Sequence, residues 1–310
     1  MGAPKLYMYM EIGETLVVGA GAIGTLLTYK LYSSGYQVDL LTRSKVDRFC
    51  WVEDSDVIGF KPTIYYLDNP PRKRYELVIL CVKAYQVDEV IDYIGGLIGG
   101  DGYIVTIQNG IGVYENLQDR FGPNRVIAAV STYGSTRLGP CNARLGGEGV
   151  FYIGGDERGV DKLSRLLQGA GLNVRKEENI DGVRWWKTIV NAGINPVTTI
   201  FRGPNKVVLE VPEAYTLAHE AVEEGVILAE EMGVKLPEDP HKSLDEVAEA
   251  TRDNISSMLQ DALRGSNTEI DYINGAIVKY SIEYGLDAPV NRVLYHIVKG
   301  MVRWRVGEPY

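Results

Sequence analysis

Hydrophobic and polar positions follow two different patterns along the chain, and the pattern changes near residue 180. Up to that point, short apolar runs such as TLVVGA (15–20) and ELVILCVK (76–83) alternate with segments of helical periodicity. A nearly continuous apolar run suits a parallel strand that is buried on both faces. Repeated βα units of this kind predict an α/β domain with a doubly wound parallel sheet over residues 1–180.

The remaining elements of this first domain follow from the same runs. Further strands are expected at 36–43, 103–110, 125–134, 149–155 and 172–176, and helices at 22–33, 86–94 and 160–170. The prolines at 62, 70 and 71 predict an irregular stretch. Residues 1–14 are expected to form an extension or arm before the first strand.

After residue 180, strand-like alternation stops and long helical periodicities begin. Candidate helices lie at 181–200, 211–232, 241–263, 268–284 and 288–305, and prolines punctuate them. Residues 181–310 are therefore expected to form a second, all-helical domain.

A glycine-rich segment follows the first strand directly. It comprises Gly19, Ala20, Gly21, Ala22, Ile23 and Gly24, and a helical pattern begins at once. Glycines at this spacing permit a tight turn, a close approach of backbone to a pyrophosphate, and close packing of helix on strand. The free N–H groups of the helix N-terminus then favour phosphate. The alternative is a purely structural turn, but the β-α-β context favours a dinucleotide site in a Rossmann domain.

The end of the second strand, LLTRSK (40–45), bears on which nicotinamide cofactor binds. An acidic residue there usually bonds the ribose 2′-hydroxyl of NAD, whereas an arginine accommodates the 2′-phosphate of NADP. Arg43 and Lys45 are basic, and Asp39 lies earlier in the strand, where it is expected to point away. This pattern predicts NADPH, with NADH possible at lower preference; the alternative is a solvated basic turn.

Composition narrows the classes of partner. The net charge is −9 at pH 7, and long Lys/Arg runs are absent, which disfavours a nucleic-acid surface. The apolar runs are shorter than a membrane span of about 20 residues, so no membrane association is expected. The three scattered cysteines fit neither a disulfide framework nor a metal site, and they suggest a reducing, cytoplasmic setting.

The helical half contains polar residues at helical spacing. Lys187, Asn191 and Asn195 recur every four residues between apolar neighbours, so they share one helix face. Asparagine is a poor helix former, and a solvated stripe would more often consist of Glu and Lys. The pattern therefore favours a functional crevice over a solvated polar stripe.

Two further groups lie toward the C-terminus. Asn254, Ser257 and Asp261 are spaced three and four apart, which predicts one helix face; Asp261 can equally be a structural partner of Arg264. Ser266 and Glu269 have the spacing of a capping box, so Glu269 is either a helix cap or a functional carboxylate. A break at residues 265–267 would let two helical segments fold back toward one site.

These motifs together resemble the ketopantoate reductase (2-dehydropantoate 2-reductase) family. The resemblance rests on GAGAIG, CVKAYQV, QNGIG, the segment with Lys187, Asn191 and Asn195-Pro, and NISSMLQDALRGSNTEIDYINGAI, and it covers nearly the whole chain. It implies a Rossmann domain followed by a helical domain, and the NADPH-dependent reduction of 2-dehydropantoate to (R)-pantoate in pantothenate and coenzyme A biosynthesis.

The resemblance also implies roles for single residues. Lys187 looks like the general acid, and Glu269 like the carboxylate that holds the substrate hydroxyl, next to the cofactor. Substrate binders would be Asn109, Asn191, Asn195, Asn254 and Ser257; Lys83 and Asn109 would lie where cofactor and substrate meet. The direction of the Lys187 pKa shift stays open, because burial lowers it and Glu269 raises it.

Several alternatives remain open at this stage. One is a related 2-oxo-acid reductase or 2-hydroxy-acid dehydrogenase of the same architecture, and another is a cofactor sensor without turnover. Cys81 is expected to be either a small buried residue or a thiol reached by a feedback ligand such as coenzyme A. A homodimer is a further expectation.

Overall fold

The computed structural model describes residues 14–43, 45, 49–53, 56–139 and 142–304. The chain forms two compact units. The first contains the residues up to Gln108 together with Val113–Ile180. The second contains Asn109–Gly112 and the residues from Asp181 onward, so a short segment from the first half of the chain packs with the helical half.

The first unit is built on an eight-stranded sheet in the order β12-β11-β8-β7-β6-β1-β2-β5. Its strands are β1 (Thr15–Val18), β2 (Val38–Thr42), β5 (Thr63–Tyr66), β6 (Tyr75–Leu80), β7 (Ile98–Thr106), β8 (Val126–Ser131), β11 (Phe151–Gly154) and β12 (Val174–Lys176). Neighbouring strands run parallel except β11 and β8, which are antiparallel. The predicted doubly wound α/β architecture is confirmed, and only this one pairing departs from a parallel sheet.

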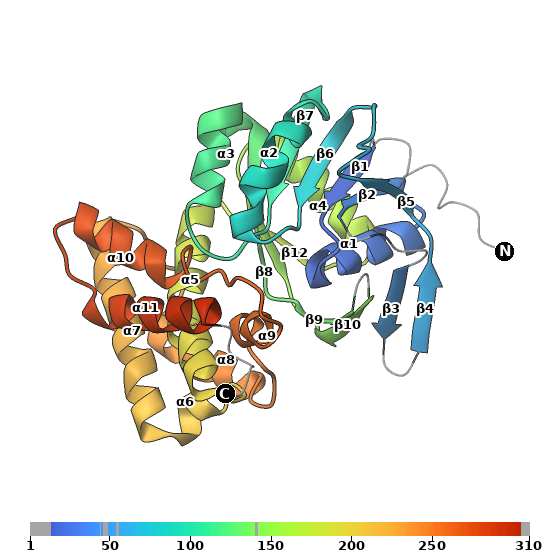
Figure 1. Cartoon of the computed structure of the whole chain (residues 1–310). Helices are drawn as coiled ribbons and strands as arrows, with labels where there is room; N and C mark the ends of the chain where they lie inside the picture. Colours follow the sequence, from blue (N-terminus) through green and yellow to red (C-terminus); the bar gives the residue numbers. More distant parts are fainter. Residues whose placement is uncertain (1–13, 44, 46–48, 54–55, 140–141, 305–310) are drawn as a thin grey trace. The chain divides into compact units, whose positions relative to one another are not determined.

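Helices cover both faces of this sheet (Figure 1). They are α1 (Ala22–Ser33), α2 (Val87–Gly95), α3 (Val113–Phe121) and α4 (Glu157–Gly169). Apolar residues of α1 and α4 share one core cluster, as expected if these two helices lie on the same face. The apolar residues of the central strands are buried because helices cover both faces, which explains their nearly continuous apolar runs. The sequence prediction missed α3.

A second, four-stranded sheet was not predicted. It has the order β4-β3-β10-β9 and comprises β3 (Phe49–Glu53), β4 (Asp56–Phe60), β9 (Gly134–Gly139) and β10 (Asn142–Gly147). The expectation of an irregular stretch is therefore wrong for β3, β4 and β5. These strands are short, and β3 pairs with β10 about 90 residues away, so local sequence carries little signal for them. Trp51 of β3 stacks on Tyr29 of α1 and joins this sheet to the main core.

The second unit is helical. Its helices are α5 (Ile180–Phe201), α6 (Val207–Glu210), α7 (Pro212–Glu231), α8 (Pro240–Ala250), α9 (Ser257–Leu263), α10 (Asn274–Glu283) and α11 (Pro289–Arg303). In the part of the chain that the structure describes, none of the helices combines the length and apolar character that a membrane crossing needs.

Two predicted helices have different limits in the structure. The helix expected at 241–263 is interrupted between Ala250 and Ser257, because Ser256 caps α9 by accepting a hydrogen bond from the Leu259 N–H. The helix expected at 268–284 begins only at Asn274, so Glu269 lies in the irregular segment before it. The break predicted at 265–267 is present, and Gly265 has φ +67° there.

A proline inside α5 creates a specific requirement. Pro196 has no N–H, so the carbonyl of Ala192, four residues earlier, loses its helical donor. The side chain of Asn274 supplies that donor, with Nδ2 3.0 Å from the Ala192 carbonyl. The same amide nitrogen lies 2.9 Å from Oδ1 of Asn291, and both asparagines are fully buried. One amide group thereby joins α5, α10 and α11.

Glu224 of α7 extends this buried network. Its carboxylate accepts hydrogen bonds from the N–H groups of Val290 and Asn291, in the first turn of α11. Asn291 also donates through Nδ2 to Glu224 and to the Ala221 carbonyl. A carboxylate at a helix N-terminus accepts hydrogen bonds from N–H groups that have no partner within the helix, and the helix dipole stabilises its negative charge. The network connects α5, α7, α10 and α11 through buried hydrogen bonds.

We predict that Asn274→Ala lowers the free energy of unfolding by about 2–4 kcal/mol, because it leaves buried acceptors without donors. In a Pro196→Ala background the helix recovers its own N–H for the Ala192 carbonyl. The cost of Asn274→Ala should then fall by at least about 1 kcal/mol. Chemical denaturation of the four proteins measures this coupling.

Asn205→Ala is the matched control, because this buried asparagine of the same unit donates to the Thr251 hydroxyl, outside the network around Ala192. Its cost should be the same in both backgrounds. An equal cost of Asn274→Ala with and without Pro196 would contradict the assignment.

Candidate functional site

The glycine-rich loop between β1 and α1 shows why each glycine is present. Gly19 has φ +105°, and a Cβ there would lie 2.8 Å from the Val82 nitrogen. A Cβ at Gly24 would lie 1.9 Å from the Gly19 carbonyl oxygen. Gly21 has an ordinary φ of −74°, and the nearest atom to its added Cβ would be 3.6 Å away. The protein itself therefore requires Gly19 and Gly24, whereas a Cβ at Gly21 would make only an ordinary van der Waals contact with the Cys81 carbonyl oxygen.

This loop fits a dinucleotide. The helix α1 begins with no side-chain cap on its N-terminal N–H groups, so they can bind phosphate. The folded protein tolerates a Cβ at Gly21, so a glycine at this position fits the close approach of backbone to a pyrophosphate in this class of loop. Ala20, Ala22 and Ile23 complete the segment and are half-buried.

A basic side chain, Arg43, is exposed at the end of β2, whereas the acidic side chain of Asp39 is buried within the strand. Asp39 is 7% exposed, accepts a hydrogen bond from the Tyr75 hydroxyl at 2.7 Å, and pairs with Lys73 at 2.8 Å. Its expected orientation away from the cofactor is thus consistent with the structure. Arg43 is exposed, and its Nη1 lies 2.7 Å from Oε2 of Glu89. Ser44, the residue after Arg43, lies outside the described residues.

Gln108 holds together the carboxyl ends of two central strands. Its Nε2 donates to the carbonyls of Leu80 at 2.8 Å and Val82 at 2.9 Å. Lys83 follows directly, half-buried, and its N–H donates to Oε1 of Gln86. This role of Gln108 was not expected from the sequence. The available signal was an amide at the end of a strand, immediately before the Asn-Gly of the QNGIG segment.

Cys81 does not have the environment of a reactive thiol. The Cys81 side chain packs against the glycine loop, since a Cβ added at Gly24 would lie 3.0 Å from the Cβ of Cys81. Burial raises the pKa of the Cys81 thiol, so the reactive thiolate is disfavoured. The interpretation as a small buried residue fits better, and no contact of the described residues supports a feedback ligand such as coenzyme A at Cys81.

In the second unit, α5 carries three of the predicted site residues at intervals of four. Lys187 and Asn191 are half-buried, and Asn195 is 6% exposed. Burial lowers the pKa of the Lys187 ammonium to about 8, and attraction to Glu269 partly opposes this shift. The direction that the sequence left open is therefore downward. An ammonium with this pKa can release its proton near neutral pH.

Glu269 is 5% exposed and is held by the QNGIG segment. Nδ2 of Asn109 donates to Glu269 Oε2 at 3.1 Å, and the Ile111 N–H donates to the Tyr272 carbonyl at 2.8 Å. Gly110, which lies between Asn109 and Ile111, has φ +90°, and a Cβ there would lie 2.2 Å from the backbone carbonyl oxygen of Tyr272. Two motifs about 160 residues apart thus form one structure around a buried carboxylate.

Asn254 and Ser257 lie in and after the turn that separates α8 from α9. Ser257 begins α9, but Asn254 precedes it, so the expected single helix face with Asp261 is wrong. Both side chains are exposed within the described chain. The carbonyl of Asn254 accepts the Asn205 N–H at 2.9 Å, which attaches the turn to the segment before α6.

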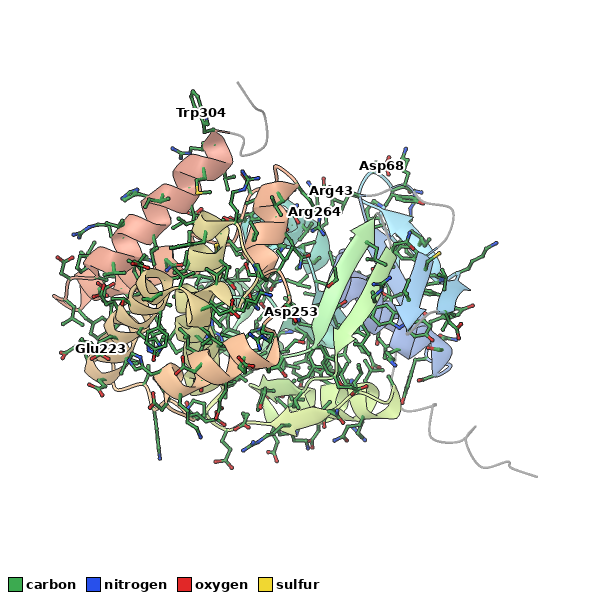
Figure 2. All side chains as sticks on the ribbon, turned by 90° about the horizontal axis from the view of Figure 1, so that it is seen from below. Arg43, Asp68, Glu223, Asp253, Arg264 and Trp304 are labelled. Carbon is green, nitrogen blue, oxygen red and sulfur yellow. The ribbon has the colours of Figure 1, made fainter. Side chains whose placement is uncertain are left out.

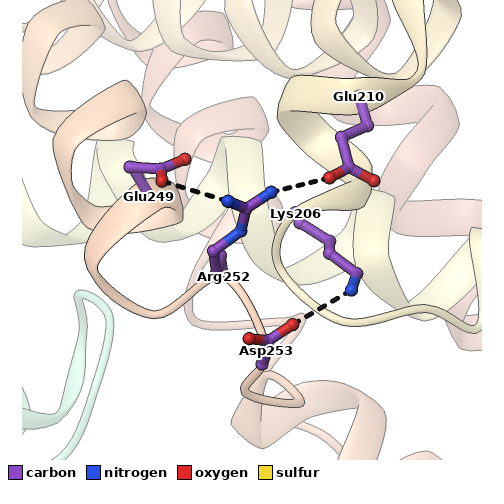
Figure 3. A network of polar contacts seen from close by, with 5 residues as sticks. All are labelled: Lys206, Glu210, Glu249, Arg252 and Asp253. Atoms are coloured by element: carbon purple, nitrogen blue, oxygen red, sulfur yellow. Dashed lines mark hydrogen bonds and ion pairs between the residues drawn. The ribbon is translucent and has the colours of Figure 1, made fainter.

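An ion-pair network surrounds this turn (Figure 3). Arg252 contacts Glu210 at 2.8 Å and Glu249 at 3.4 Å, while Lys206 contacts Asp253 at 3.0 Å. These pairs are exposed, so each contributes little energy singly. Together they limit the freedom of the residues that precede Ser257.

For two residues, Asp261 and Glu269, the sequence also allowed a purely structural role, and the structure bears on each. Asp261 is 7% exposed and lies 3.9 Å from Arg264 on the same turn, which fits a local ion pair. Glu269 does not cap a helix through a capping box with Ser266, because α10 begins five residues later. Within the described residues, no group of His, Cys, Asp and Glu side chains could hold a metal ion.

We predict that Gly24→Ala destabilises the protein by about 1–3 kcal/mol, because its Cβ would overlap the Gly19 carbonyl. Gly21→Ala should change stability by less than about 0.5 kcal/mol, because the site has room, yet weaken NADPH binding at least about tenfold. Thermal unfolding and fluorescence titration with NADPH separate the two effects. Unchanged NADPH affinity in Gly21→Ala would contradict a pyrophosphate site at this loop.

Comparison with known proteins agrees with this arrangement. The family model "Ketopantoate reductase PanE/ApbA" matches residues 15–157, and its C-terminal counterpart matches residues 179–302. A 2-dehydropantoate 2-reductase of Pyrobaculum aerophilum is 37% identical over 91% of this chain and 96% of its own length.

Solved structures also match nearly the full chain. A PanE/ApbA family ketopantoate reductase from Ralstonia eutropha JMP134 has a TM-score of 0.87 at 25% identity, covering 94% of this chain and 99% of that one. A D-mandelate dehydrogenase with NADH and anilino(oxo)acetate has a TM-score of 0.87 at 24% identity, covering 94% and 99%, and shows the shared fold alone. On these grounds, the chain belongs to the ketopantoate reductase family.

Proposed function

We propose that this chain reduces 2-dehydropantoate to (R)-pantoate with NADPH, a step of pantothenate and coenzyme A biosynthesis. The observation that carries the proposal is the half-buried Lys187, whose pKa is lowered to about 8 and which interacts with the buried Glu269. Reduction of a ketone requires a proton donor for the carbonyl oxygen. Full-length relatives named for this reaction support the substrate.

Lys187 acts as the general acid in this proposal. The nicotinamide supplies a hydride to the carbonyl carbon when it is bound. The Lys187 ammonium stabilises the negative charge that develops on the carbonyl oxygen and delivers the proton that completes the alcohol. A pKa of about 8 makes this ammonium a stronger acid than ordinary lysine while it stays mostly protonated at pH 7.

Glu269 and the asparagines bind and orient the substrate. Asn109 fixes the Glu269 carboxylate by its hydrogen bond, and the carboxylate accepts the substrate hydroxyl. Asn191, Asn195, Asn254 and Ser257 provide amide and hydroxyl groups for the remaining polar atoms of the keto acid. Their placement on α5 and around the start of α9 supports this assignment.

The first unit holds the cofactor. The segment from Gly19 to Gly24 binds the pyrophosphate at the start of α1, and Lys83 contacts the cofactor near the substrate. Arg43 binds the 2′-phosphate, which gives preference for NADPH over NADH. A homodimer and a cytoplasmic location remain predictions; one solved relative, from Staphylococcus aureus, is described as dimeric.

The direct test is the loss of reduced-nicotinamide absorbance on mixing the protein with 2-dehydropantoate, run in parallel with NADPH and NADH. Rapid oxidation that depends on the keto acid supports the proposal. A panel of unbranched and aromatic 2-oxo acids serves as the control for substrate class. Faster turnover of another keto acid would assign the chain to a different reductase, and tight NADPH binding without any turnover would indicate a sensor.

We predict that Lys187→Ala lowers kcat about 10²–10⁴-fold, the usual contribution of general acid catalysis, while NADPH affinity stays within about twofold. Steady-state kinetics and fluorescence titration measure the two quantities. Lys242→Ala is a matched control, because this lysine is exposed on α8 and should leave kcat unchanged. Near wild-type kcat in Lys187→Ala would remove this residue from the proton-donor role.

We further predict a pH dependence set by Lys187. Because its pKa is about 8, kcat/KM for reduction should be level below that pH and fall about tenfold per pH unit above it, as the ammonium loses its proton. Oxidation of pantoate needs the neutral amine, so its kcat/KM should rise through the same pH and level off above it. Initial rates in both directions test this, and a level reduction profile up to about pH 10 would contradict it.

A further inference from the structure

Glu89 places a carboxylate beside the residue that we assign to the 2′-phosphate. Arg43 follows β2 and is labelled in Figure 2, and Glu89 lies in the first turn of α2. Oε2 of Glu89 is 2.7 Å from Nη1 of Arg43, and the two side chains are 53% and 54% exposed. The contact joins residues 46 positions apart, so it depends on the packing of α2 next to the end of β2.

The acidic residue of β2 cannot take this place. The Asp39 carboxylate is buried, accepts the Tyr75 hydroxyl, and pairs with Lys73, whose second carboxylate partner is Glu14. These contacts hold the Asp39 carboxylate in the interior, away from the exposed end of β2. The carboxylate found at the exposed end of β2 comes from a different element, α2.

We propose that Glu89 sets the balance between NADPH and NADH by competing with the 2′-phosphate for Arg43. This inference rests on the proposed function, in which Arg43 binds that phosphate. An arginine side chain has several N–H donors, and one of its Nη1 donors is already directed at Glu89. A 2′-phosphate must share the guanidinium with a like charge or displace it. A dinucleotide without this phosphate meets no such repulsion.

The expected size of the effect follows from charge screening. Two unit charges about 4 Å apart in water interact by enough to change a binding constant about fivefold. The stabilisation that an exposed ion pair gives its arginine is at most about as large. A 2′-phosphate carries more than one negative charge at pH 7, so a carboxylate repels it more strongly than it repels a unit charge. Repulsion therefore exceeds the benefit of orientation, and Glu89 lowers the preference for NADPH.

The test is calorimetric titration of NADPH, NADH, 2′,5′-ADP and 5′-AMP into the wild type and three variants. Glu89→Gln should tighten NADPH and 2′,5′-ADP about three- to tenfold and leave NADH and 5′-AMP within about twofold. High salt should reduce the difference, because both groups are exposed. Asp88→Asn is the matched control, since Asp88 is exposed in the same helical turn and carries the same charge. It should leave the ratio of NADPH to NADH affinity within about twofold.

Two results would overturn the inference: an unchanged affinity ratio in Glu89→Gln, or an equal change in Asp88→Asn. Arg43→Ala separates this failure from failure of the phosphate site. If Arg43→Ala weakens NADPH about tenfold or more but leaves NADH unchanged while Glu89→Gln has no effect, only the role of Glu89 is wrong. If Arg43→Ala weakens both dinucleotides equally, the phosphate assignment fails as well. Turnover of 2-dehydropantoate, measured in parallel, reports on the reaction independently of both.

Discussion

The helical unit depends on the hydrogen bond from Asn274 to the carbonyl of Ala192 that Pro196 leaves without a donor. That carbonyl is next to Asn191 and lies on the helix that carries Lys187. Asn274 itself begins α10, just after the irregular segment with Glu269. A single buried amide thus connects the helix that carries Lys187 to the segment that carries Glu269. Asn291 of α11 accepts a hydrogen bond from the same amide, and Glu224 of α7 in turn accepts one from Asn291.

This scaffold explains why irregular backbone is tolerated at the centre of the unit. Glu269 lies outside regular helix, and a buried irregular segment must find hydrogen-bond partners for its backbone. The segment Asn109–Gly112 supplies one of them, since the Ile111 N–H donates to the Tyr272 carbonyl, and the Asn109 side chain separately binds the Glu269 carboxylate. The close approach at Gly110 excludes any side chain there. The lowered pKa of Lys187 follows from the same enclosure, because burial penalises the ammonium more than Glu269 stabilises it.

The sequence predicted best those features whose causes are local. The β1-glycine-α1 unit was placed correctly because a buried strand, three glycines and a largely buried, apolar helix lie within 20 residues. The pattern of α5 and α7 was equally clear, and α5 continues through Pro196. Errors arose where the cause was distant. The strands β3 and β10 stabilise each other across about 90 residues, and the helix expected at 241–263 is interrupted at a turn that Asn205 and Lys206 hold from another part of the chain.

By itself, the sequence determined the α/β and helical halves and the glycine loop, because residue type and short spacing encode these features. Spacing and the family resemblance together indicated the candidate site residues. Only the tertiary structure decided how those residues are used. It assigned Asn109 to the Glu269 carboxylate, set the direction of the Lys187 pKa shift, buried Asp39 and brought Glu89 to Arg43. Each of these depends on burial or on a contact between segments far apart in sequence, and neither can be read from local spacing.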